Sequence, residues 1–283
     1  MRCQWQEVLR VIPPWMRDDV DKLGKNRMQE LRLRLGQKPE LRMGQSNVFL
    51  DRIVSREDIH YVVNIGSQYS PWAAATMGKG YLTIRGGHRI GLCGDAVIHD
   101  GNMTGIREVT GLCIRVARDF PGIAAGVKAL KGSVLILGPP GSGKTTLLRD
   151  LIRQRSNTGN GCVAVVDERG EIAGVCRGVP QLAVGCHTDV LDGCPKAAGI
   201  LMLLRALNPE IIAVDEITAQ EDIAAIISAA HCGVTLLSTL HAASVEELKE
   251  KPLYESMLNS RVFSRAIVIK REGEERMYEV KML

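Results

Sequence analysis

The sequence has few aromatic residues and no long apolar run. Phe, Trp and Tyr make up 4% of the 283 residues, so we expect a core built from Val, Ile, Leu, Ala and Met. Residues 1–10 contain no apolar segment with a small-residue cleavage site, which argues against a signal peptide. No stretch approaches the ~18 consecutive apolar residues of a membrane span. We therefore expect a cytoplasmic protein without a transmembrane helix.

The cysteine and charge patterns exclude further classes. None of the eight cysteines forms a C-x-x-C pair, so we expect neither a disulfide framework nor a zinc cluster. The net charge of +4 is small, and a nucleic-acid-binding protein usually shows a clearer basic footprint. We therefore expect no nucleic-acid partner.

The two halves of the chain differ in pattern. In residues 1–120, an alternating segment (31–35), a helical segment with a Ser N-cap (55–65) and short β-like runs (81–115) indicate a small α+β domain. In residues 121–283, continuous apolar runs alternate with helical segments. Continuous apolar strands are typical of a parallel sheet covered on both faces, which predicts an α/β domain.

Residues 138–145, GPPGSGKT, match the phosphate-loop pattern G-x-x-x-x-G-K-[ST]. An apolar run, 134–137, precedes the loop and a helical segment follows it, as the pattern requires. Lys144 should reach the β- and γ-phosphates, and the Thr145 hydroxyl should bind Mg²⁺. The predicted nucleotide-binding residues are Gly138, Pro139, Pro140, Gly141, Ser142, Gly143, Lys144, Thr145 and Thr146.

Two apolar runs end in an Asp-Glu pair. The run at 211–214 leads into Asp215 and Glu216, as in a Walker B motif, and the run at 163–166 leads into Asp167 and Glu168. Asp215 is the candidate for the Mg²⁺ shell, and Glu216 is the candidate for polarising the attacking water. Glu168 is a second candidate for that role, and the residues themselves do not choose between the two glutamates.

A third apolar run, 234–238, continues into His241. A polar residue that ends a strand beside the phosphate loop is placed to sense the γ-phosphate, and a histidine can do so through a ring N–H. His241 is therefore a candidate sensor, although a lone histidine is more often structural.

These four segments resemble the boxes of the traffic ATPases of type II and type IV secretion and of type IV pili. The segments 138–146, 166–168, 209–216 and 238–244 follow the family's order of phosphate loop, Asp box, Walker B and histidine box. The segments 89–94, 166–173 and 187–196 resemble more specifically the stage III sporulation AA family of endospore-forming bacteria.

The resemblance implies an ATP- and Mg²⁺-dependent hydrolase with a RecA-like P-loop core and a smaller N-terminal domain. It further implies a hexameric ring that docks on an integral-membrane partner, serving the channel between mother cell and forespore from the mother-cell side. The resemblance also implies that Glu168 is a catalytic acid beside Lys144 and that His241 is a γ-phosphate sensor. Rings of this kind use arginines from a neighbouring subunit or domain, for which Arg107, Arg115 and Arg169 are the candidates.

Two other functions are compatible with the motifs. A nucleic-acid-dependent RecA-like ATPase would share the phosphate loop, but it would favour a basic groove with interleaved aromatic residues, which is not evident here. A nucleotide-gated scaffold with little turnover would explain a Walker B motif that reads Asp-Glu where the secretion family usually has Gly-Glu.

Overall fold

The computed structural model describes residues 1–44, 46–68, 77–78, 80–127, 130–158, 162–272 and 275–283. The backbone divides into two compact units. Unit 1 contains Met1–Arg118 and Gly174–Gln181, and unit 2 contains Asp119–Ala173 and Leu182–Leu283. Gly174–Gln181 thus joins unit 1 although its sequence neighbours belong to unit 2. The domain boundaries 1–120 and 121–283 remain a prediction.

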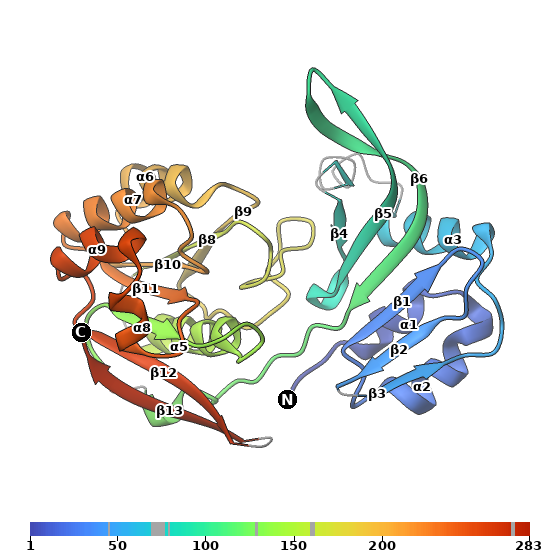
Figure 1. Cartoon of the computed structure of the whole chain (residues 1–283), viewed down its shortest axis with the longest axis horizontal. Helices are drawn as coiled ribbons and strands as arrows, with labels where there is room; N and C mark the ends of the chain where they lie inside the picture. The colour runs from blue at the N-terminus through green and yellow to red at the C-terminus, as the bar shows by residue number, and fades with distance from the viewer. Residues whose placement is uncertain (45, 69–76, 79, 128–129, 159–161, 273–274) are drawn as a thin grey trace. The chain divides into compact units, whose positions relative to one another are not determined.

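Unit 1 is built on an antiparallel sheet with the strand order β3-β2-β1-β6-β5-β4 (Figure 1). Leu31 and Leu33 of β1 are fully buried, whereas Arg34 is exposed, as the alternating sequence predicts. The strands are β1 (Glu30–Arg34), β2 (Glu40–Met43), β3 (Ser46–Phe49), β4 (Tyr81–Thr83), β5 (Arg89–His99) and β6 (Asn102–Arg115), and the helices are α1 (Trp5–Val11), α2 (Arg17–Gly24) and α3 (Arg56–Ser67).

Helix α3 begins with a complete capping box, which confirms the predicted Ser N-cap. The Ser55 hydroxyl accepts a hydrogen bond from the Asp58 N–H at 3.2 Å, and Asp58 accepts one from the Ser55 N–H at 2.9 Å. Such a cap contributes about 1 kcal/mol to helix stability. The other Asp58 oxygen accepts a hydrogen bond from the Trp15 indole at 2.8 Å, which ties the start of α3 to the N-terminal helices.

Unit 2 contains the larger sheet, with the strand order β13-β12-β7-β11-β10-β8-β9. All neighbouring strands are parallel except β12 and β13, so the predicted parallel sheet is confirmed and carries one antiparallel edge strand. The strands are β7 (Val134–Leu137), β8 (Val163–Asp167), β9 (Thr188–Asp192), β10 (Ile211–Val214), β11 (Thr235–Leu240), β12 (Arg265–Glu272) and β13 (Glu275–Met282).

Helices cover both faces of this sheet (Figure 1). The connection β7–α5–β8 and the connection β10–α7–β11 run in opposite directions across the sheet, so right-handed crossovers place α5 and α7 on opposite faces. No helix in the described ranges is long and apolar enough to cross a membrane. The helices are α5 (Lys144–Thr158), α6 (Lys196–Leu207), α7 (Gln220–His231), α8 (Val245–Lys249) and α9 (Glu255–Asn259).

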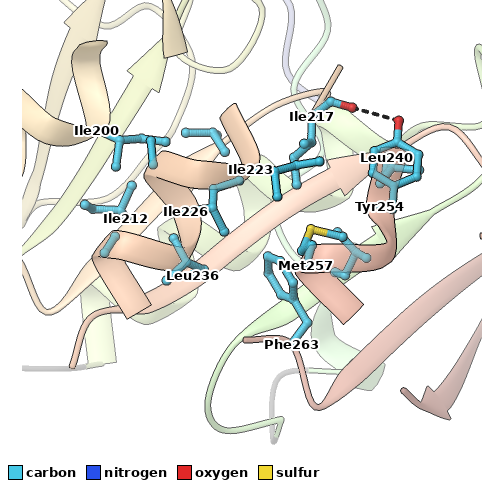
Figure 2. Packing of buried hydrophobic residues seen from close by; sticks show 14 of the residues in the cluster. Ile200, Ile212, Ile217, Ile223, Ile226, Leu236, Leu240, Tyr254, Met257 and Phe263 are labelled. Atoms are coloured by element: carbon cyan, nitrogen blue, oxygen red, sulfur yellow. Dashed lines mark hydrogen bonds between the residues drawn. The ribbon is translucent and has the colours of Figure 1, made fainter. Parts of the chain in front are cut away.

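The main core of unit 2 lies between the sheet and α6, α7 and α9 (Figure 2). Ile212 of β10 and Leu236 of β11 contribute fully buried side chains, and Ile200, Ile223 and Ile226 contribute the same from the helices. Tyr254 donates a hydrogen bond to the Ile217 carbonyl at 3.1 Å. This bond anchors the segment that follows the Walker B acids to the core.

Candidate nucleotide-binding site

The phosphate loop connects β7 to α5 in a compact turn. Gly141 and Gly143 have φ values of 72° and 102°, which side chains with a Cβ rarely adopt. A Cβ at Gly138 would lie 2.5 Å from the Ser142 hydroxyl, so this position also excludes a side chain. The Ser142 hydroxyl is buried and has no hydrogen-bond partner among the described residues. The motif glycines therefore form the tight loop that the sequence predicts.

Lys144 is the first residue of α5 and is only 5% exposed. Its ammonium group donates hydrogen bonds to the carbonyls of Gly138 at 2.9 Å and Pro139 at 3.0 Å. Burial lowers the pKa of Lys144, and the charges of Glu216 and Asp215 act in the opposite direction. The loop thus holds a cation whose direct protein partners are neutral.

Thr145 and Thr239 both bind Asp215. The Thr145 hydroxyl donates to one Asp215 oxygen at 2.7 Å, and the Thr239 hydroxyl donates to the other at 2.5 Å. Burial raises the pKa of Asp215, and the charges of Glu216 and Asp167 add to this effect, while both hydroxyls oppose it. The structure therefore joins the two predicted Mg²⁺ ligands, Thr145 and Asp215. Thr239 is a contact that sequence reasoning did not assign.

Glu216 and His241 also meet. The His241 Nε2 lies 2.9 Å from one Glu216 oxygen, and its Nδ1 lies 2.8 Å from the Lys144 ammonium group. Because the ammonium group can only donate, a neutral imidazole with its proton on Nε2 satisfies both partners. His241 thus links the phosphate loop to the Walker B glutamate, and its role as a γ-phosphate sensor stays a prediction.

The acids of the other pair have separate surroundings. Asp167 is 2% exposed and accepts hydrogen bonds from the backbone N–H groups of Glu171, Ile172 and Ala173 at 2.8 to 3.1 Å. The Glu168 carboxylate instead pairs with the Lys196 ammonium group at 2.6 Å. Asp167 therefore shapes the loop after β8, and only Glu168 remains available for chemistry.

One pocket brings the two acidic pairs together. Because β8 and β10 are parallel neighbours, with Val166 opposite Val214, their carboxyl ends lie side by side as predicted. Lys196 lies in the same lining, and the sequence offers no specific signal for it beyond a lysine at the start of a helix. The pocket is lined by Val166, Asp167, Glu168, Arg169, Glu171, Lys196, Asp215 and Glu216.

The candidate arginines are distributed over both units. Arg169 lies in this chain's own site, with its guanidinium group 3.1 Å from Glu216. Arg107 and Arg115 belong to unit 1, each 3.8 Å from an acid, Asp95 and Glu30 respectively. Their action on a neighbouring subunit remains a prediction.

A further arginine, which sequence reasoning missed, contacts the phosphate loop. Arg276 of β13 donates a hydrogen bond from Nε to the Ser142 carbonyl at 2.9 Å. A Cβ at Gly143 would lie 3.0 Å from the same Nε, so the side chain lies directly against the loop.

The residues present fit a nucleoside triphosphate with Mg²⁺. The glycine loop, the unpartnered Ser142 hydroxyl and the Lys144 ammonium group are hydrogen-bonding groups suited to phosphate oxygens. Thr145 and Asp215 offer the oxygen ligands that Mg²⁺ prefers. Lys144 would hold the phosphates, and Thr145 with Asp215 would hold the metal.

Solved structures with the same fold are RecA-like secretion ATPases, which confirms the predicted fold class. The Legionella pneumophila ATPase DotB matches 95% of this chain and 80% of its own, with a TM-score of 0.60 and 18% identity. The pilus retraction motor PilT, solved with ADP, matches 94% and 81%, with a TM-score of 0.63 and 16% identity.

Sequence comparisons identify the family. A stage III sporulation protein AA from Bacillus subtilis (strain 168) is 38% identical over 279 residues, covering 94% of this chain and 91% of the relative. An uncharacterised protein, ycf45, from Porphyra purpurea is 27% identical over 256 residues, covering 87% and 42%. The family model for sporulation stage III, protein AA, matches residues 4–280. The chain therefore belongs to the sporulation stage III protein AA family.

Proposed function

We propose that this chain is a Mg²⁺-dependent ATPase of the traffic type. The observation that carries the proposal is the junction of phosphate loop and Walker B strand, where the Thr145 hydroxyl binds Asp215 at 2.7 Å beside Lys144. Bound Mg²⁺ supplies neutralisation of phosphate charge at such a junction. The likeness in fold to DotB and PilT, each described as an ATPase or a motor, supports the same reading.

Each residue then has a defined task. Lys144 binds the terminal phosphates, and the N-terminus of α5 adds the positive end of its helix dipole. One glutamate orients the attacking water and accepts its proton. His241, between Lys144 and Glu216, senses whether the γ-phosphate is present.

The two glutamates differ in what they contact. Glu216 binds His241 and Arg169, and its backbone has a φ value of 51°, a conformation that is uncommon outside glycine. Glu168 binds Lys196 and faces the same pocket. Both carboxylates therefore line the same pocket, and substitution of each separates their roles.

The test is steady-state phosphate release from ATP by the wild type, Glu168→Gln and Glu216→Gln, alongside ATP affinity. The variant that removes the water-orienting acid should bind ATP normally and hydrolyse it roughly 100-fold more slowly, since general base catalysis contributes a factor of that order. A wild-type rate in both variants would contradict the assignment of either acid.

The assembly belongs to the same proposal. We infer a hexameric ring, cytoplasmic and held at a membrane by an integral-membrane partner, which energises a channel complex during sporulation. Membership of a sporulation family and the fold shared with secretion ATPases support this. Arg107, Arg115 or Arg169 would complete a neighbour's site. Mass photometry with ATP and Mg²⁺ should show the ring, and a strict monomer at micromolar concentration would argue against it.

A further inference from the structure

Lys196 is a buried cation that has no role in the ATPase mechanism proposed above. Its side chain is 8% exposed, and its ammonium group lies 2.6 Å from a Glu168 oxygen and 3.8 Å from an Asp222 oxygen. Removing a lysine from water is costly unless acids pair with it, and these two carboxylates meet that requirement. The ion pair is open on one side, because the Glu168 side chain remains 36% exposed and both residues line the pocket.

The loop that follows Glu168 is held by bonds that do not involve Lys196. Asp167 accepts hydrogen bonds from the N–H groups at 171, 172 and 173, and Arg149 donates to the carbonyls of Glu171 and Ile172. The loop after β8 is therefore held at both its amides and its carbonyls. The side chain of Glu168 is held separately, by the hydrogen bond that the Lys196 ammonium group donates to it at 2.6 Å.

Lys196 also connects to the segment that follows the Walker B acids. Asp222, its second carboxylate neighbour, is 9% exposed in its side chain and accepts hydrogen bonds from the N–H groups of Thr218 and Ala219. Those two residues lie between Glu216 and the start of α7. Lys196 thus lies between the loop that carries Glu168 and the segment that carries Glu216.

We propose that Lys196 is a positioning residue that holds the Glu168 carboxylate at the angle needed to orient the attacking water. This inference rests on the proposed ATPase function and deepens it, because it assigns the water-orienting role to Glu168. The ammonium group fixes one Glu168 oxygen, and the other oxygen is left to accept a hydrogen bond within the pocket. Lys196 itself does not touch the nucleotide in this scheme.

The test is a double-mutant cycle on phosphate release, with Lys196→Met, Glu168→Gln and the double variant. Loss of the ammonium group should lower kcat roughly 10- to 100-fold, since a small misplacement of a catalytic group has an effect of this size. The affinity for a non-hydrolysable ATP analogue should stay within about threefold, because Lys196 lies outside the phosphate loop. Lys196→Arg, which retains the charge, should recover part of the rate.

The decisive result is the coupling between the effects of Lys196→Met and Glu168→Gln on kcat. Once Glu168→Gln has removed the carboxylate, adding Lys196→Met should change kcat by less than about threefold, because the two residues act as one unit. Lys270→Met is a matched control, because it removes an exposed lysine of β12 that pairs with Glu279 at 2.7 Å, and it should leave kcat unchanged. If Lys196→Met does not fold, Lys196→Gln replaces it in the cycle.

Three results would overturn the inference: a wild-type rate in Lys196→Met, effects of Lys196→Met and Glu168→Gln that multiply in full, or a fall in ATP affinity as large as the fall in kcat. A wild type without Lys144-dependent turnover would contradict the ATPase function itself. Because the wild type and Lys144→Ala are assayed before any Lys196 variant, failure of the ATPase function is distinguished from failure of the role proposed for Lys196.

Discussion

Thr239 serves both Walker B acids from the neighbouring strand. Its hydroxyl donates to Asp215 at 2.5 Å and accepts a hydrogen bond from the Glu216 N–H at 2.8 Å. Its carbonyl accepts a third bond, from the Ile217 N–H at 3.1 Å. Since Glu216 adopts a left-handed backbone conformation with φ 51°, these bonds explain how the strained turn is held.

Thr239→Val keeps the shape of the side chain and removes the hydroxyl. We expect the free energy of unfolding to fall by about 1–3 kcal/mol, because the Glu216 N–H and an Asp215 oxygen lose their partner. The Mg²⁺-dependent part of ATP binding should weaken as well. Urea denaturation and nucleotide titration with and without Mg²⁺ check both effects. Thr235→Val, at the other end of β11, is the control and should change neither.

The sequence predicts which residues form the candidate site, but it does not predict every contact that they make. The phosphate loop and Asp215 follow from pattern and position, and the structure places them in contact. The two Asp-Glu pairs look equivalent in the sequence. Asp167 accepts hydrogen bonds from backbone N–H groups because the loop after it turns back, whereas Asp215 accepts them from the Thr145 and Thr239 hydroxyls. No spacing of side chains encodes that turn.

At the scale of elements, the C-terminal hairpin extends the sheet beside the phosphate loop. Strand β12 pairs with β7 in parallel, with Val268 opposite Leu137, and β13 pairs with β12. Arg276 at the start of β13 consequently reaches the Ser142 carbonyl.

Arg276→Met should weaken ATP binding roughly tenfold, because a hydrogen bond from a charged donor contributes about 1.5–3 kcal/mol. Fluorescence titration with a labelled ATP analogue measures the change in Kd. Lys281→Met on the same strand, which removes a cation paired with Glu279, should leave the Kd unchanged. Equal affinities of wild type and Arg276→Met would show that the hairpin does not support the loop.

The elements that sequence predicts best are those with a strong period or a continuous apolar run. The apolar run at 211–214 matches strand β10 in the structure. Strand β13 was not predicted, because it is an edge strand with mixed polarity whose pairing depends on β12. The short β-like runs predicted within 81–115 include β5, which continues to His99 as one long strand whose outer half pairs with β6.

At the scale of the whole molecule, unit 1 includes a short segment from the second half of the chain, which local sequence patterns do not reveal. Gly174–Gln181 belongs to unit 1, where the Gln181 amide oxygen accepts a hydrogen bond from the Gly86 N–H at 3.0 Å. Membership of a unit is a long-range property, and sequence periodicity reports only local structure. The change of sequence pattern near residue 120 therefore carries no information on where Gly174–Gln181 belongs.

Unit 1 carries a pH-sensitive group in its core. His88 is fully buried, its Nδ1 accepts a hydrogen bond from the Ala117 N–H at 3.0 Å, and its Nε2 lies 3.0 Å from the Gln4 carbonyl. The Nδ1 must therefore stay unprotonated. Burial lowers the pKa of His88, and the charge of Arg118 adds to this effect, while the Gln4 carbonyl and Glu7 oppose it.

A lowered pKa means that the unfolded chain binds the proton more readily than the folded chain. Stability is then complete above the unfolded pKa of about 6.5 and is lost as the pH falls toward the folded value, with a slope of at most ~1.4 kcal/mol per pH unit for one proton. Urea denaturation at about ten pH values between pH 8 and pH 5 measures the slope of the unfolding free energy against pH. His88→Gln should show a smaller slope, whereas His60→Gln, at an exposed position, should match the wild type.

The measurement that tests the central claim most directly is phosphate release from ATP and Mg²⁺ by the wild type and Lys144→Ala, side by side. We predict measurable turnover by the wild type, its loss on chelation of Mg²⁺, and a rate at least ~100-fold lower in Lys144→Ala, because the ammonium group stabilises the charge that develops on the phosphates. Turnover by Lys144→Ala at the wild-type rate would contradict the assignment of this loop as the catalytic site.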